Sequence, residues 1–211
     1  MIKIGITQRI NFIQEYGEYR DQLDLNWSEL FIKIGMVQVL LPNNPKIIDK
    51  ATIDSFDLQG IILSGGEFLD EKDKDYNESQ KKRDEFEKKL LTYCLTKKIP
   101  ILGVCRGMQF LNNFFGGKIK KVNNHVGAKH EINNFSKLPL PAIVNSFHEY
   151  VINDKYLPKN FKILSTDLEG NLEAFSDNTN NIMGIMWHPE REKPFCNEDL
   201  NLFKCFFEGK E

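Results

Sequence analysis

The sequence predicts an α/β protein in which an open, mostly parallel sheet lies between two layers of helices. Three short, largely apolar runs at residues 2–6, 36–41 and 58–63 have the pattern of buried parallel strands. Segments with helical spacing separate them, as expected for β-α-β units. Two more such runs, at residues 99–104 and 182–186, extend the pattern into the second half of the chain.

The helices are predicted from apolar residues that recur every three or four positions. One stripe covers residues 27–34, a weaker one residues 47–51, and longer ones residues 80–98, 108–115 and 200–207. The nearly wholly polar stretch 67–79 predicts a loop. In the second half, residues 142–146, 161–165 and 172–175 predict further strands. We find neither an internal repeat nor a linker, so we expect residues 1–211 to form one domain.

Composition excludes several classes of partner. The net charge of −2 gives no basis for binding nucleic acid or an anionic membrane, and no apolar stretch reaches the ~18 residues of a membrane span. The first residues have the pattern of a strand rather than of a signal peptide, and the four cysteines are scattered. We therefore expect a cytoplasmic protein with reduced thiols, no metal and no cofactor. Composition leaves the choice between monomer and homodimer open.

The segment Gly103-Val104-Cys105-Arg106-Gly107 places a cysteine between a buried strand and an amphipathic helix. Glycines two residues to either side relieve the crowding of a tight strand-to-helix turn, as in the nucleophile elbow of α/β hydrolases. Free N–H groups at the start of the helix favour the thiolate form of Cys105. We expect the chemistry to take place here.

A cysteine nucleophile needs a base, and the base needs an orienting acceptor. His188 directly follows a buried strand, which places it at the carboxyl edge of the sheet with Cys105. Glu190 lies two residues further, on the same side of an extended backbone. The sequence therefore predicts a Cys105–His188–Glu190 triad; the alternative is a buried cysteine and a strand-end histidine that never meet.

The turn at residues 64–67, Ser-Gly-Gly-Glu, also follows a buried strand. Adjacent glycines allow backbone N–H groups to face a ligand. We expect the amides of Gly66 and Arg106 to form an oxyanion hole. From this segment alone, a plain turn is an equally good explanation.

Taken together, the segments GVCRGMQ (103–109), WHPE (187–190) and SGG (64–66) resemble the class I glutamine amidotransferase-like family, which has a Cys-His-Glu triad. The resemblance covers most of the chain and implies a flavodoxin-like fold. Further features are similar to the free-standing γ-glutamyl hydrolases of this superfamily: Arg83-Asp84 with Glu87, residues 114–117, 125–130 and 144–148, and Leu172-Glu173-Ala174.

The resemblance implies that Cys105 attacks a γ-glutamyl carbonyl to form a thioester, which water then hydrolyses to release glutamate. It also implies that Gln109, Ser146, Phe147 and His148 hold the glutamyl group. For His148, a loop histidine without a catalytic part is an equally good alternative. We expect His125 and His130 to be loop residues rather than ligands.

The polar stretch after the first strand places Arg9 and Arg20 near the same edge as Cys105, where arginine suits a phosphate. A surface loop with internal salt bridges is the simpler alternative for either residue. The chain is also similar to short family members found among capsule and surface-sugar genes. This likeness implies that the group released is cytidine diphosphoramidate, for which the polar insert after Gly66 would leave room.

Two other functions remain open. A glutaminase subunit would pass ammonia to a separate synthetase, and its activity would rise when that partner binds. A non-enzymatic redox or chaperone module would use the cysteine elbow alone, but it leaves His188-Pro189-Glu190 unexplained.

Overall fold

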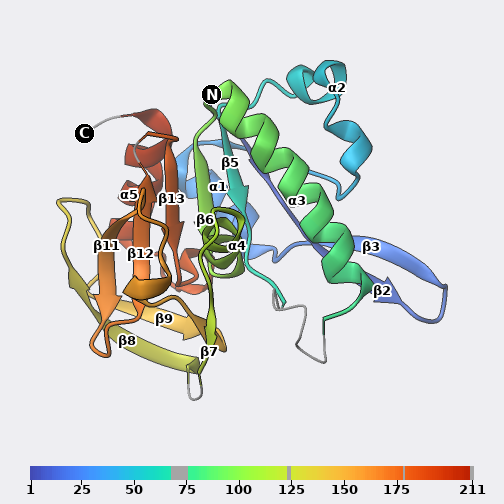
Figure 1. Cartoon of the computed structure of the whole chain (residues 1–211). Coiled ribbons are helices and arrows are strands. Elements are labelled where there is room, and N and C mark those ends of the chain that lie inside the picture. Colours follow the sequence, from blue (N-terminus) through green and yellow to red (C-terminus); the bar gives the residue numbers. More distant parts are fainter. Residues whose placement is uncertain (68–75, 123–124, 178, 210–211) are drawn as a thin grey trace.

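The computed structural model describes residues 1–67, 76–122, 125–177 and 179–209, and a nine-stranded sheet runs through them (Figure 1). The strand order is β4-β1-β5-β6-β13-β12-β11-β8-β9. The first five strands are parallel: β4 (Val37–Leu40), β1 (Lys3–Ile6), β5 (Gly60–Leu63), β6 (Ile101–Val104) and β13 (Ile182–Ile185). The other four pair antiparallel: β12 (Leu172–Asp177), β11 (Lys162–Asp167), β8 (Val126–Asn134) and β9 (Ile143–Phe147).

Helices cover both faces of the parallel strands, which confirms the predicted three-layer α/β fold. On one face, α1 (Asn26–Ile34) and α5 (Asn197–Glu208) contact each other and share an apolar core with Ile4, Ile6 and Ile62. On the other face, α2 (Lys50–Ser55), α3 (Glu78–Lys97) and α4 (Arg106–Phe114) share a core with Ile61, Leu63 and Ile101. Both faces of these strands are therefore buried, as their apolar sequences require.

The start of α3 is defined by side-chain capping. Asn77 accepts a hydrogen bond from the Ser79 amide at 2.8 Å, and the Gln80 side chain accepts one from the Asn77 amide at 2.9 Å. This capping box satisfies backbone donors that a helix start leaves free. The capping box fixes the start of α3 a few residues before Arg83 and Glu87, whose charged side chains lie near the candidate site.

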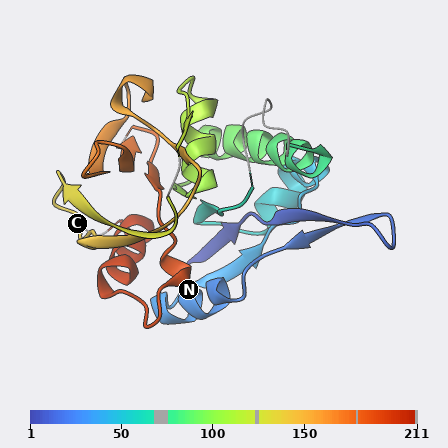
Figure 2. The same ribbon diagram turned by 90° about the horizontal axis from the view of Figure 1, so that it is seen from below.

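Three parts of the fold were not predicted. The polar run after β1 forms the hairpin β2 (Arg9–Ile13) and β3 (Glu18–Gln22), which projects from the molecule (Figure 1, Figure 2). Strand β8 replaces a stretch expected to be loop, and β7 (Lys120–Lys121) pairs with β10 (Tyr150–Val151). These strands are largely exposed or very short, so they lack the apolar runs that reveal buried strands.

The shorter elements are three 3-10 helices, η1 (Pro45–Ile47), η2 (Asp154–Tyr156) and η3 (Pro189–Arg191). The predicted weak helix near residues 47–51 is thus η1 followed by α2. Most of the predicted loop at 67–79, including the polar insert, lies outside the described residues. In the described ranges, no helix combines the length and apolar character that crossing a bilayer would require.

Candidate active site

Cys105 occupies the turn between β6 and α4 with a backbone φ of 51° and ψ of −106°. A positive φ is unfavourable for a residue with a side chain and is typical of strained functional positions. The Cys105 amide donates to the Ile185 carbonyl at 2.8 Å, and its carbonyl accepts from the Gln109 amide at 3.0 Å. These two bonds hold the strained turn between β13 and the first turn of α4.

The two predicted glycines are required by close backbone approach. A Cβ atom on Gly107 would lie 2.0 Å from the Leu63 carbonyl oxygen, and one on Gly103 would lie 2.6 Å from the Gly107 carbonyl carbon. The elbow therefore packs directly against the end of β5. Any side chain at either position would push Cys105 away from that edge.

His188 follows β13 and lies beside Cys105, as the sequence predicts. Its Nδ1 is 2.7 Å from Glu190 Oε1, and its ring is near enough to Cys105 for the two side chains to interact electrostatically. Burial alone would lower the pKa of His188, but the negative charges and hydrogen bonds of Cys105 and Glu190 raise it to about 9. This environment favours the protonated, imidazolium form of His188.

Asn145, which the sequence analysis did not single out, holds the backbone of His188. Its Oδ1 accepts from the His188 amide and its Nδ2 donates to the His188 carbonyl, both at 2.9 Å. Asn145 comes from β9, in the antiparallel half of the sheet. Its position inside the 144–148 segment was the only available signal.

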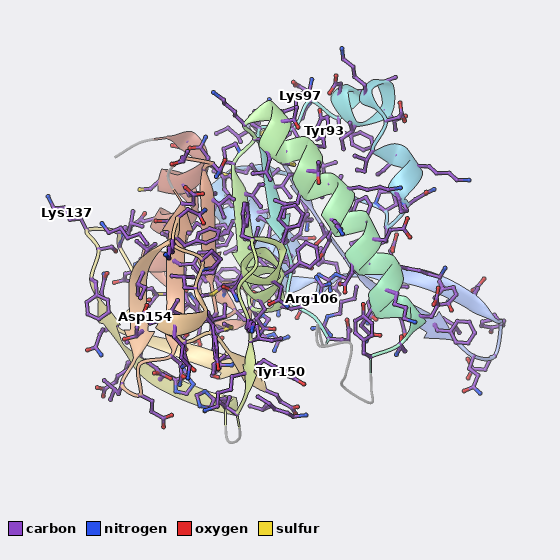
Figure 3. All side chains as sticks on the ribbon, in the orientation of Figure 1. Tyr93, Lys97, Arg106, Lys137, Tyr150 and Asp154 are labelled. Atoms are coloured by element: carbon purple, nitrogen blue, oxygen red, sulfur yellow. The ribbon has the colours of Figure 1, made fainter. Side chains whose placement is uncertain are left out.

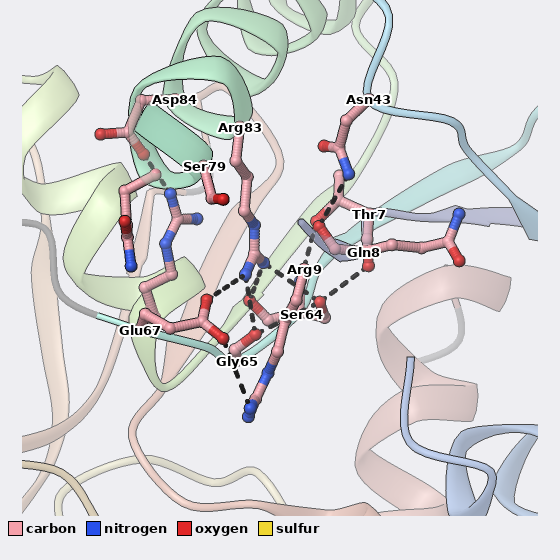
Figure 4. Close-up of polar contacts among 12 residues, drawn as sticks. Thr7, Gln8, Arg9, Asn43, Ser64, Gly65, Glu67, Ser79, Arg83 and Asp84 are labelled. Carbon is pink, nitrogen blue, oxygen red and sulfur yellow. Dashed lines mark hydrogen bonds and ion pairs between the residues drawn. The ribbon is translucent and has the colours of Figure 1, made fainter. Parts of the chain in front are cut away.

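The turn after β5 is held by Arg83 from α3 (Figure 4). Arg83 Nη1 donates to the Gly65 carbonyl at 3.1 Å and Nη2 donates to the Ser64 carbonyl at 2.7 Å. A Cβ on Gly65 would lie 2.5 Å from His188 Cε1, and one on Gly66 would lie 2.2 Å from Arg83 Nη1. The turn thus fits closely between the histidine ring and the guanidinium.

Below this turn lies a fully buried ionic network centred on Glu87. Its Oε1 accepts from Arg83 Nε at 2.9 Å and from Thr7 Oγ1 at 2.7 Å, and its Oε2 accepts from Arg106. Arg106, seen in Figure 3, also pairs with Asp84. Burial raises the pKa of Glu87, but the two arginines outweigh burial and hold it below its usual value. Burial lowers the pKa of Arg83 to about 10, which still leaves it charged at neutral pH.

Two cavities lie on either side of the Cys105–His188 pair. The cysteine cavity, about 220 Å³, is lined by Cys105, Gly66, Gln109, Phe147 and His148 among others. The histidine cavity, about 250 Å³, is lined by His188, Glu190, Arg9, Arg191 and Trp27 among others. The cavities therefore divide the site into a side next to Cys105 and a side next to His188.

The predicted glutamyl contacts fall mainly in the cysteine cavity. Gln109, Phe147 and His148 line it, and Gln109 Nε2 donates to the Tyr150 carbonyl at 3.0 Å. Ser146 is buried instead, with its hydroxyl donating to the His125 carbonyl at 2.5 Å. In the structure, burial lowers the pKa of His148 to about 3, and the neighbouring histidines add to this effect.

Of the two predicted arginines, only Arg9 lines a described cavity. It lies in the histidine cavity and pairs with Glu67 at 3.6 Å (Figure 4). Arg20 is exposed on β3 and pairs with Glu18, so the structure does not bring it to the site. Arg191, which the sequence analysis missed, follows the WHPE segment and lines the histidine cavity, with its guanidinium 4.5 Å from the centre of the Phe147 ring.

The expectation that His125 and His130 are loop residues is wrong for His130. His130 belongs to β8, whereas His125 immediately precedes that strand. The error arose because β8 has an exposed, mostly polar face and no apolar run. Both histidines lie close to His148, at ring-centre distances of 5.3 Å for His125 and 6.3 Å for His130.

The fold and the site define a three-layer α/β protein with a cysteine, a histidine and a carboxylate at the carboxyl edge of parallel strands. The chain belongs to the glutamine amidotransferase class I family, whose model matches residues 18–207. It is 38% identical over 97% of its length to the γ-glutamyl-CDP-amidate hydrolase of Campylobacter jejuni, covering 96% of that protein.

One further relative and one solved structure are also similar to the chain. It is 29% identical over 79% of its length to a glutamine-hydrolysing GMP synthase subunit of Pyrococcus abyssi, covering 83% of that protein. Its fold matches a glutamine amidotransferase from Thermotoga maritima with a TM-score of 0.65 at 17% identity, over 99% of this chain and 85% of the other.

Proposed function

We propose that the protein hydrolyses a γ-glutamyl amide through a thioester on Cys105, with His188 as acid and base and Glu190 as its orienting partner. The observation that carries the proposal is the strained elbow at Cys105 facing a histidine that a carboxylate holds at 2.7 Å. Both the nucleophile and the proton donor are thereby poised on one edge of the sheet.

The proposed reaction has an acylation step and a hydrolysis step. The Cys105 thiolate adds to the γ-carbonyl carbon, and the amides of Arg106 and Gly66 stabilise the resulting oxyanion. His188 donates its proton to the amide nitrogen as the C–N bond breaks and the thioester forms. A water molecule then loses a proton to His188, attacks the thioester and releases glutamate together with the Cys105 thiolate.

The two cavities support a division of the substrate. The glutamyl group fits the cysteine cavity, next to Gln109, Phe147 and His148. The departing amine would then leave through the histidine cavity, where Arg9 and Arg191 provide two cations. Guanidinium groups suit a diphosphate.

For the leaving group we propose cytidine diphosphoramidate, so that the substrate is γ-glutamyl-CDP-amidate. The 38% identity to the Campylobacter jejuni enzyme, which extends over nearly the full length of both chains, supports this choice. A role in the biogenesis of capsule or surface polysaccharide would follow. The four free thiols fit a protein of the reducing cytoplasm.

The test is to incubate the purified protein with γ-glutamyl-CDP-amidate, glutamine and other γ-glutamyl amides and to measure glutamate release. We expect turnover by the protein alone, fastest with the nucleotide substrate. Arg9→Ala should raise KM for that substrate about tenfold or more relative to glutamine, because a charged hydrogen bond contributes about 1.5–3 kcal/mol. Arg20→Ala is the matched control, and an equal effect of both changes would refute a phosphate contact at Arg9.

A glutaminase that serves a separate synthetase is the second candidate, and the likeness to the Pyrococcus abyssi GMP synthase subunit favours it. In that case glutamine would be the best substrate and hydrolysis would rise sharply with a synthetase partner. Substantial turnover of γ-glutamyl-CDP-amidate without any partner would exclude this alternative.

A further inference from the structure

Three of the four histidines in the chain converge next to the cysteine cavity. His130 lies on β8, His125 immediately precedes that strand, and His148 follows β9, which pairs with β8. The ring centres of His125 and His130 are 4.8 Å apart. One ring nitrogen of each histidine lies within 4.8 Å of those of the other two.

These ring nitrogens lack hydrogen-bond partners among the described residues. His125 Nδ1, His130 Nε2 and both nitrogens of His148 are buried and unpaired there. Buried polar atoms are nearly always satisfied in native proteins, by protein groups, water or a bound ion. Four unpaired nitrogens in one cluster therefore indicate a missing common partner.

Glu173, on β12, supplies a second observation. It is 1% exposed, and neither carboxylate oxygen has a partner within the part of the chain that the structure describes. Its Oε1 lies 4.0 Å from His148 Nε2. A carboxylate beside an imidazole is the usual arrangement that orients a metal-binding histidine.

We propose that His125, His130 and His148 bind one divalent transition-metal ion of the zinc type and that Glu173 orients His148. Three imidazoles suit Zn²⁺, whereas Mg²⁺ and Ca²⁺ require oxygen ligands. At Zn–N distances of about 2.0–2.1 Å the nitrogens must move together by roughly 1.5 Å, which small side-chain rotations provide. Three protein ligands also leave a fourth position open.

The ion would lie outside the Cys105–His188 pair but share a wall with it, because His148 lines the cysteine cavity. It would connect β8 to the segment after β9 and bring a positive charge to the edge of that cavity. The sequence predicts no metal, because its four cysteines lack zinc-type spacing and His125 and His130 are expected to be loop residues. This inference does not depend on which γ-glutamyl amide is the substrate.

The test is a zinc titration of chelator-treated protein in a Cys105→Ser background, which removes the nucleophilic thiolate as a competing ligand. Competition with a chromophoric chelator should give one equivalent of Zn²⁺ bound, with Kd below about 1 µM. His125→Ala and His130→Ala should each weaken binding by about a hundredfold or more, and Glu173→Gln by about 10–100-fold. Co²⁺ in place of Zn²⁺ should give a visible absorption band that the histidine variants lack.

His188→Ala in the same background is the matched control, because it removes the one histidine outside the cluster, and it should keep one equivalent of zinc. His130 is half-buried, so His130→Ala should retain the fold as judged by circular dichroism even where His125→Ala does not. Absence of stoichiometric binding, or equal zinc binding by His130→Ala and its parent, would overturn the proposal. Histidine-dependent stabilisation by inorganic pyrophosphate instead of zinc would also overturn it, in favour of an anion site.

Discussion

The parallel and antiparallel halves of the sheet each contain a buried glutamate, and the surroundings of these two side chains are opposite. Glu87, beneath the parallel strands, is fully buried and contacts Thr7, Arg83 and Arg106. Glu173, on antiparallel β12, is equally buried, yet both its oxygens lack a partner among the described residues. Glu87 is therefore a satisfied structural carboxylate, whereas Glu173 has oxygens beside the proposed metal site that accept no hydrogen bond from any described residue.

The electrostatics of the two carboxylates follow their surroundings. Burial raises the pKa of both groups, but for Glu87 the two arginines outweigh burial and lower it. At Glu173 burial and the nearby Asp167 and Cys105 act in the same direction, so its pKa lies well above the usual range. The Glu87 carboxylate is thus stabilised by paired charges, whereas burial disfavours the charged form of Glu173.

The largest expected effect is at Cys105, the proposed nucleophile, which follows a parallel strand. Cys105→Ala should lower kcat by about 10⁴-fold or more, because no other group can form the thioester. Glutamate release under saturating substrate measures this effect. Cys205→Ala, a thiol on α5 away from the elbow, is the control, and residual turnover of Cys105→Ala close to that control would remove Cys105 from its role.

The next largest effect is expected at Glu87, the buried carboxylate that has charged partners. Glu87→Met should lower the free energy of unfolding by about 3–5 kcal/mol, because it removes the carboxylate that two buried arginines share and leaves only Asp84 to pair with Arg106. Urea denaturation measures the change. Glu85→Met on the same helix removes an exposed pair with Lys89 and should change stability by less than about 0.5 kcal/mol. A similar small change for both would show that the network does not support the fold.

The pH dependence of catalysis tests the coupling between His188 and Cys105. His188 must carry a proton for the leaving nitrogen, and its pKa is raised to about 9, so kcat/KM for amide cleavage should fall as the pH rises through 9. The expected slope is about tenfold per pH unit. In Cys105→Ala the imidazolium loses its negative partner, so the His188 pKa measured by NMR should fall. An unchanged pKa would show that the thiolate does not stabilise the imidazolium.

The smallest effect is expected at Glu173, the buried carboxylate without a partner among the described residues. With chelator present, Glu173→Met should change the free energy of unfolding by less than about 1 kcal/mol or raise it, because a buried polar group without partners gives way to an apolar one. Urea denaturation under the conditions used for Glu87→Met makes the effects of the two substitutions directly comparable. A loss of several kcal/mol at Glu173 would erase the proposed difference between them.

Sequence patterns predicted the parallel half because its strands and turns depend mainly on residues that are neighbours in the chain. Buried strands show as apolar runs, and the glycines around Cys105 show where the backbone must turn tightly. The same patterns predicted that His188 and Glu190 follow a strand whose carboxyl end lies near Cys105. The sequence patterns did not reveal β8 in the antiparallel half or the separate β2–β3 hairpin, because these strands are held by pairing with other strands while most of their side chains face solvent.

By itself, the sequence determined the three-layer core, the elbow and the candidate triad, since each depends on residues adjacent in the chain or on strand ends that parallel pairing brings together. The tertiary structure decided the contacts between distant segments. It assigned Arg83 and Glu87 to the support of the Ser64–Gly66 turn, Asn145 to the backbone of His188, and Arg191 rather than Arg20 to the histidine cavity. It also brought together His125, His130 and His148, which are 5 to 23 positions apart in the sequence. They are close in space because β8 and β9 pair antiparallel.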